Sequence, residues 1–146
     1  MTDETRSPVT PTPQGNYVTA VVHDGMAISA GMTPRVGGSL AVTGIIGADL
    51  TVEEGRRAAS IAASNALLAI AQAGGGLDQI DRCLQMTVYL VCTADFTRHS
   101  TVADGASVSL DAWLGARGKV ARAAIGVLCL PSGAPVEVTL TAALRR

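Results

Sequence analysis

Arg122 is the residue whose type and position most clearly allow ligand chemistry in this sequence. It lies in residues 121–130, a run that otherwise has the composition of a strand. An arginine on a strand must reach solvent, pair with an acid or bind an anion, because a buried unpaired charge is costly. Its planar guanidinium matches the geometry of a carboxylate. The pattern leaves two possibilities equally open: a structural role, as an ion pair or an exposed arginine on an edge strand, and a carboxylate-binding role.

The residues that follow Arg122 divide into two faces by strand alternation. Arg122 shares one face with the small residues Ala124 and Gly126, which would leave room for a ligand beside the charge. The opposite face is expected to be core, and it carries Ala123, Ile125, Val127 and Cys129. Cys129 is therefore expected to be a buried, inert side chain.

Glu137 and Thr139 are the second set of candidate residues. They share one face of the predicted strand 136–144, whose other face is apolar. Such a semi-polar face is a poor core but could line a cleft between subunits. Glu137 could act as a general base if it faced such a cleft. A threonine hydroxyl can hold a water molecule but cannot act as a base near neutral pH.

The composition limits the classes of function. A chain of 146 residues with 48% hydrophobic residues suits one domain with a sizeable core. A net charge of -1 and four aromatic residues do not favour nucleic acid or an acidic membrane as a partner. Three cysteines without metal-ligand spacing and two distant histidines predict no metal site and no cofactor. With no signal peptide or transmembrane run, we expect a cytoplasmic protein with reduced thiols.

Local signals predict one domain and the elements within it. Residues 1–14 are expected to be a flexible arm, and residues 15–146 a single domain. Strands are predicted over 17–23 and 26–30 around an Asp24-Gly25 turn, and a glycine-rich loop with a short extended piece over 34–47. Further strands are predicted over 82–91, 121–128 and 136–144, and helices after Thr51 and over 99–114.

The first helix has signals at both of its ends. Thr51 and Glu54 form a capping box, and Gly74-Gly75-Gly76 ends the helix. Asn65 lies near the apolar stripe of this helix and is expected to make a hydrogen bond to a nearby loop. The order β-β-α-β-α-β-β predicts an α+β fold with one mixed sheet and both helices on one face.

Four segments resemble the RidA/YjgF/UK114 family in order and spacing. They are residues 15–18 (GNYV), 28–34 (ISAGMTP), 102–107 (VADGAS) and the closing run 121–138, which contains ARAAIGV, LP and VEV. The resemblance covers about residues 15–144. It implies a chorismate-mutase-like fold that assembles as a homotrimer, with active sites in the clefts between subunits.

The resemblance also implies a chemistry. Relatives with this arginine hydrolyse reactive enamines and imines, such as 2-aminoacrylate, to 2-keto acids and ammonia. Arg122 matches the residue that holds the substrate carboxylate, and Tyr17 matches an aromatic that lines the cleft. The positions that match residues facing the ligand are Ala30, Gly31, Ala123 and Ala124.

This chain departs from the family pattern at three positions. Many deaminating relatives carry an acid where Thr139 stands, so Glu137 alone would have to serve as the base. Ala30 replaces a hydroxyl with a methyl. Asp104 replaces an asparagine, and its charge would repel a substrate carboxylate, pair with Arg122 or pair with a substrate iminium.

Several functions therefore remain open. The first is an enamine or imine deaminase, or a close hydrolytic variant. The second is a trimer that binds a small carboxylate, such as a keto acid, without turnover. A repurposed biosynthetic enzyme in the same cleft is the third. Ribonuclease activity, a label often attached to the family, is disfavoured by the low basic charge, the few aromatics and the lack of a histidine pair.

Overall fold

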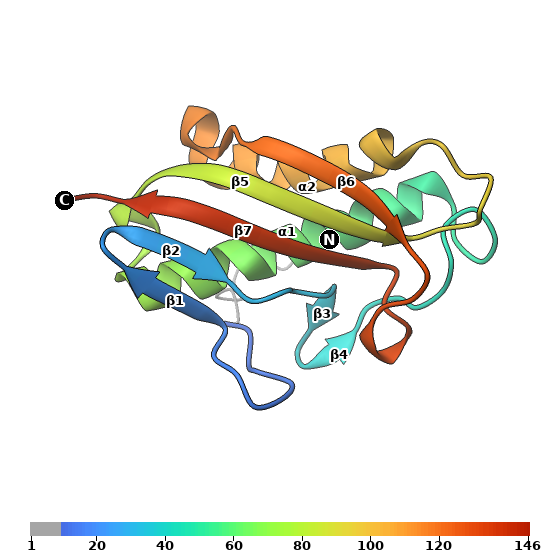
Figure 1. Cartoon of the computed structure of the whole chain (residues 1–146), viewed down its shortest axis with the longest axis horizontal. Coiled ribbons are helices and arrows are strands. Elements are labelled where there is room, and N and C mark those ends of the chain that lie inside the picture. Colours follow the sequence, from blue (N-terminus) through green and yellow to red (C-terminus); the bar gives the residue numbers. More distant parts are fainter. Residues whose placement is uncertain (1–9) are drawn as a thin grey trace, which may run out of the picture.

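Five strands form one mixed sheet in the structure, a computed structural model that describes residues 10–146 (Figure 1). The sheet order is β1-β2-β7-β5-β6, with only β5 and β6 parallel. The strands are β1 (Ala20–His23), β2 (Met26–Ser29), β5 (Ile80–Val91), β6 (Ala121–Val127) and β7 (Val136–Leu144). A separate hairpin pairs β3 (Arg35–Val36) with β4 (Ser39–Leu40).

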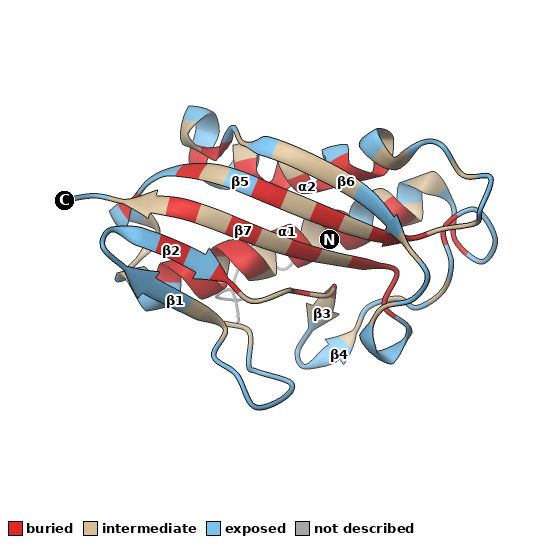
Figure 2. Ribbon diagram, viewed as in Figure 1, coloured by how far each residue is buried: buried red, intermediate tan, exposed pale blue. Residues whose placement is uncertain are grey.

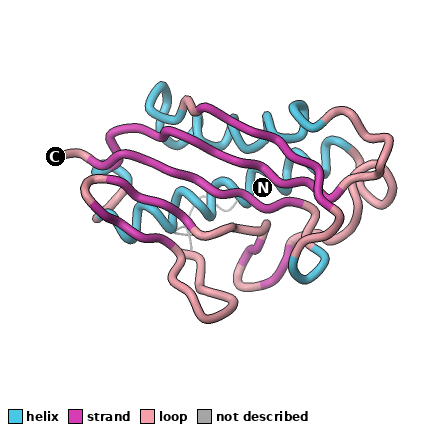
Figure 3. Tube along the Cα trace, in the orientation of Figure 1, coloured by secondary structure: helices cyan, strands magenta, loops and turns pink. Residues whose placement is uncertain are grey.

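Both long helices cover the same face of this sheet (Figure 3). They are α1 (Val52–Gly74) and α2 (His99–Leu114), and three short 3-10 turns follow or join the elements: Leu77–Gln79, Gly115–Gly118 and Pro131–Gly133. The predicted α+β fold and its β-β-α-β-α-β-β order are confirmed, with the β3–β4 hairpin as an addition in the glycine-rich loop. No helix within residues 10–146 is long and apolar enough to cross a membrane.

Local sequence signals explain where α1 begins and ends. The Thr51 hydroxyl accepts a hydrogen bond from the Glu54 backbone N–H (3.1 Å), and the Glu54 carboxylate accepts one from the Thr51 N–H (3.2 Å). This is the predicted capping box. The helix ends at Gly75, whose φ of 95° is left-handed. The Asp24-Gly25 turn is also confirmed, since both residues have positive φ angles of 49° and 75°.

The core lies between the sheet and the two helices. Buried and less buried residues alternate along β7, so that one face packs on the helices (Figure 2). The inward side of α1 consists mostly of alanines, which lets α2 approach closely. At the closest point a Cβ on Gly105 of α2 would overlap the carbonyl oxygen of Arg56. Glycine at this position is therefore a requirement of helix packing.

The two faces of β6 were predicted the wrong way round. Arg122 pairs in register with the buried Met86 of β5, so its face is the one that α2 covers. A Cβ on Gly126 would lie 2.9 Å from His99 Nε2, so α2 fills the space that was expected to hold a ligand. The face predicted to be core is open in the single chain, because Ile125 is 43% exposed.

The predicted N-terminal arm is only partly described. Residues 1–9 lie outside the described residues, and residues 10–19 contain no helix or strand. The first strand was predicted from Tyr17 but begins at Ala20.

Candidate functional site

Arg122 is held by four hydrogen bonds to α2. Its Nη1 donates to Asp104 Oδ1 (2.9 Å) and to Ser107 Oγ (2.9 Å). Its Nη2 donates to the carbonyl oxygen (3.2 Å) and the hydroxyl (2.9 Å) of Ser100. The side chain is 18% exposed, and the four terminal N–H groups are all used. Three alternatives were left open for Asp104, and the structure confirms the ion pair with Arg122.

A shallow hollow adjoins Arg122 on the surface between β6 and α2. It is lined by Thr97, His99, Ser100, Arg122, Ala124, Ile125 and Gly126. Ala124 therefore lies beside Arg122 as expected, although the residue also packs against the core. Ala123 occupies the opposite face of the strand, since its register partner is Thr87.

The three cysteines differ in their environments. Burial raises the pKa of the Cys83 thiol to about 11, and burial also raises the pKa of Cys92, whose Sγ lies 3.5 Å from His99 Nε2. Cys129 is exposed, so the prediction that it is buried was wrong. The residue follows an edge strand whose outer face the helices do not cover. Within residues 10–146 no three metal-binding side chains gather at one point.

Glu137 and Thr139 lie on the face of the sheet that the helices leave open. Their register partners in β5 are Tyr89 and Thr87. Burial raises the pKa of the Glu137 carboxyl. A Cβ on Gly31 would lie 2.6 Å from Glu137 Oε2, so the carboxyl packs directly over the backbone of that glycine. The structure therefore brings Glu137 together with Gly31.

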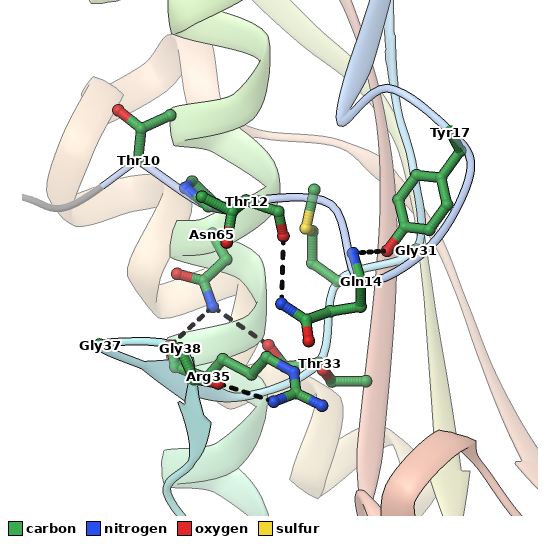
Figure 4. A pocket seen from close by; sticks show the side chains of 12 residues that line it. Thr10, Thr12, Gln14, Tyr17, Gly31, Thr33, Arg35, Gly37, Gly38 and Asn65 are labelled. Atoms are coloured by element: carbon green, nitrogen blue, oxygen red, sulfur yellow. Dashed lines mark hydrogen bonds between the residues drawn. The ribbon is translucent and has the colours of Figure 1, made fainter.

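A pocket of about 320 Å³ lies beside Gly31, between the N-terminal segment, the loop before β3 and α1 (Figure 4). Tyr17 and Gly31, both predicted site residues, line it together with Thr10, Pro11, Thr12, Gln14, Met32, Thr33, Arg35, Gly37, Gly38 and Asn65. The Tyr17 hydroxyl accepts a hydrogen bond from the Gln14 backbone N–H (3.0 Å). Asn65 Nδ2 donates to the carbonyl oxygens of Thr33 (3.1 Å) and Arg35 (3.0 Å), which confirms the predicted bond to a nearby loop.

Within one chain the predicted site residues fall into two groups. Tyr17, Gly31 and Glu137 lie at the end of the molecule that contains β2 and β3. Arg122, Asp104 and Ala124 lie at the β6 edge, on the face opposite to Glu137. Ala30 donates its N–H to Thr19 and packs against the core. No single site in the described chain holds both Arg122 and Glu137.

The residues that complete both groups were not predicted from the sequence. Ser100 and Ser107 had a detectable signal, because with Asp104 they follow a spacing of four and three residues, which is one face of a helix. The sequence signal for Arg35 is weaker. Arg35 is a cation in a glycine-rich loop, and a loop has no periodicity that predicts where a side chain points.

Comparisons with known proteins agree with this fold. The chain is 38% identical over 134 residues to Protein TCP17 of Trypanosoma cruzi, which covers 90% of this chain and 82% of that protein. The structure of Agrobacterium tumefaciens Atu1372, a protein of unknown function, superposes with a TM-score of 0.87 at 32% identity, covering 92% of this chain and 86% of that one. The structure of a "putative endoribonuclease" from Shewanella oneidensis superposes with a TM-score of 0.89 at 29% identity, covering 94% of this chain and 91% of that one.

The family assignment rests on nearly the whole sequence. Residues 5–144 match the family described as "YjgF/chorismate mutase-like, putative endoribonuclease". The resemblance inferred from the four motifs is thereby confirmed, and the chain belongs to the YjgF family.

Proposed function

We propose that this protein hydrolyses small carboxylate-bearing imines or enamines to 2-keto acids and ammonia. The observation that carries the proposal is Glu137, a carboxyl whose pKa is raised by burial and which packs over Gly31. A carboxylate with a raised pKa accepts a proton from water more readily near neutral pH than an ordinary one. Family membership supplies the scaffold on which the proposal rests.

The proposed site needs a second copy of the chain, because Arg122 and Glu137 lie on opposite faces of one sheet. The face that carries Glu137 also exposes large apolar side chains: Val21, Ile28 and Ile125. Exposed apolar surface of this kind favours burial between subunits. We propose a homotrimer in which the β6 edge of one copy meets the Glu137 face of its neighbour.

Six of the predicted residues would share the work of this cleft. Arg122 would bind the substrate carboxylate after exchanging part of its contacts with Asp104 and Ser100, and so fix the C=N carbon. Thr139 would hold the attacking water, while Glu137 takes its proton. Glu137 would then give this proton to the nitrogen of the carbinolamine. The C–N bond breaks as the hydroxyl loses its proton, which yields ammonia and the keto acid. An enamine would first tautomerise to the imine. Tyr17, Ala123 and Ala124 would line the cleft and set its size.

One observation favours a second candidate, which is binding without turnover. The terminal N–H groups of Arg122 are already used by Asp104, Ser107 and Ser100, so a substrate carboxylate must compete with the chain's own acceptors. A cleft of this kind could hold a small keto acid as a sensor does. The family's endoribonuclease label receives no support from the histidines, since His23 lies on β1 and His99 on α2.

The deciding experiment measures ammonia release from 2-aminoacrylate or a branched imine generated in the same tube. We expect the wild type to accelerate release, Arg122→Ala to abolish the acceleration and Glu137→Gln to lower it by about 10²–10⁴-fold. Arg57→Ala, which removes an exposed arginine of α1, is the matched control and should behave as wild type. Sedimentation of each variant tests the trimer.

Two outcomes would count against deamination. An intact trimer that does not accelerate release excludes the enzyme, and titration with 2-oxobutyrate then tests binding alone. Full activity in Arg122→Ala would exclude Arg122 as the carboxylate anchor.

A further inference from the structure

We propose that the pocket of Figure 4 is a second binding site, which takes a small carboxylate that also bears a hydroxyl group. Arg35 is its cation. The pocket is lined by residues of one chain and shares Tyr17 with the proposed cleft. It needs neither Arg122 nor a second copy, and it goes beyond the proposed deaminase chemistry.

The first support is the lack of partners around Arg35. A guanidinium has five N–H donors, and the one hydrogen bond made by this side chain within residues 10–146 runs from Nη1 to the carbonyl oxygen of Gly38 (2.9 Å). No carboxylate of the described residues forms an ion pair with it. Its Nε is buried and has no hydrogen-bond partner among residues 10–146. A partly buried cation with so few contacts is costly unless an anion compensates it.

The second support is that the surrounding backbone holds Arg35 in place. Asn65 of α1 donates to the carbonyl oxygens of Thr33 and Arg35, so the strand is tied to a long helix. Gly37 and Gly38 have positive φ angles of 62° and 86° and turn the chain so that the Gly38 carbonyl meets the guanidinium. The cation is therefore presented by a fixed loop, as a preformed binding site requires.

The third support is the rest of the lining, in which the described residues include no acid. The threonine hydroxyls, the Gln14 amide and the Tyr17 ring surround the space, with Met32 and Pro11 as apolar walls. The Thr33 hydroxyl makes no hydrogen bond within the described residues, so it is available to a ligand hydroxyl. A single guanidinium suits one carboxylate in bidentate geometry, whereas the greater charge of a phosphate would call for further cations.

A pocket of about 320 Å³ is at the small end of metabolite sites, which favours a short ligand. Calorimetric titration of the full chain with lactate, propionate, propane-1,2-diol and inorganic phosphate tests each part of the proposal. We expect lactate to bind, propionate to bind up to about tenfold more weakly because it lacks the hydroxyl, and the uncharged diol not to bind. Phosphate should bind more weakly than lactate.

Variants assign the binding to this pocket. Arg35→Gln should weaken lactate binding by at least about tenfold, because the charged contact is lost. Gln14→Glu leaves Arg35 intact but places a carboxylate in the same lining, and should weaken binding as well. Arg57→Gln also removes an arginine, at an exposed position of α1 outside the pocket, and should leave lactate binding unchanged. Arg122→Lys shows separately whether any lactate binds in the cleft between subunits. Thermal melts confirm that each variant is folded.

Several results would overturn the proposal. They are absence of lactate binding to the wild type, tighter binding of phosphate than of lactate, and loss of binding in Arg122→Lys with retention in Arg35→Gln. Binding that appears only after Asp3→Asn with Glu4→Gln would mean that the chain's own acids occupy Arg35. A failed deaminase assay leaves these binding results unaffected, so the two proposals can fail separately.

Discussion

Arg122 and Arg35 are two arginines that the same chain holds in opposite ways. Arg122 lies at the β6 edge and donates four hydrogen bonds to side chains and backbone of α2. Arg35 lies on β3 and, within the described part of the chain, donates one, to a carbonyl of its own hairpin. Both are partly buried. Both arginines lie on strands, so this position alone does not decide the role of an arginine. The role depends on how many of its N–H groups find acceptors among neighbouring residues.

This difference separates structural dependence from ligand dependence. Arg122 contributes to the packing of α2 against the sheet edge, whether or not a substrate also uses it. Removal of Arg35 should cost the fold little stability. An anion bound to Arg35 should stabilise it. Of the four changes that follow, Arg122→Met and Arg35→Met test the two sides of that contrast directly.

Gly105→Ala should have the largest effect, because the added methyl overlaps the backbone of Arg56 and must push α2 away from α1. We expect a loss of roughly 3 kcal/mol in the free energy of unfolding, measured with urea. Val108→Ala, at an exposed position of the same helix, should change it little. Lactate binding should survive in folded Gly105→Ala, since no residue of α2 lines the Arg35 pocket.

Arg122→Met should destabilise the chain by roughly 1–3 kcal/mol, because Asp104 and both serines lose a charged partner. Urea unfolding of the variant beside wild type measures the loss. A loss below about 0.5 kcal/mol would mean that the four bonds contribute little, and the contrast with Arg35 would then disappear.

Arg35→Met should change the free energy of unfolding by less than about 1 kcal/mol, since one hydrogen bond is lost and an unpartnered Nε is removed. Saturating lactate should raise the melting temperature of the wild type but not that of the variant. An Arg35→Met protein as unstable as Arg122→Met would show that Arg35 has a structural partner.

Glu137→Gln should give a small effect whose sign depends on pH. Burial raises the folded pKa of this carboxyl above 4.5, so protonation contributes stability that is fully present below pH 4.5 and is lost as the pH rises through the folded value. The variant should therefore melt at a higher temperature than wild type at neutral pH and at the same temperature below pH 4.5. A constant difference across this range would contradict the raised pKa.

Much of the fold could be predicted because its signals are local. The residues 99–114 and 136–144 were predicted with the bounds that α2 and β7 have, and the capping box at Thr51 is formed as its spacing indicates. Caps, turns and periodicity depend on neighbours within a few positions along the chain, and a single sequence contains that information.

The orientation of β6 could not be predicted for a physical reason. Alternation divides a strand into two faces but does not say which face the helices cover. The small residues Ala124 and Gly126 were interpreted as space for a ligand, yet they are the space into which α2 packs. The Arg35 pocket was missed because its residues come from three segments that only tertiary structure brings together.

The place of β7 in the sheet has a consequence for folding. This strand follows every other strand in the sequence, yet it lies between β2 and β5 near the middle of the sheet. The β1–β2 hairpin has no other strand to join, and Met32 pairs with Val138, more than a hundred residues later. A nascent chain on the ribosome can therefore form its first hairpin and α1 early, but it cannot close the sheet until β7 has emerged. Until then the edges of β2 and β5 stay open to other chains, which is the interval in which a chaperone would matter most.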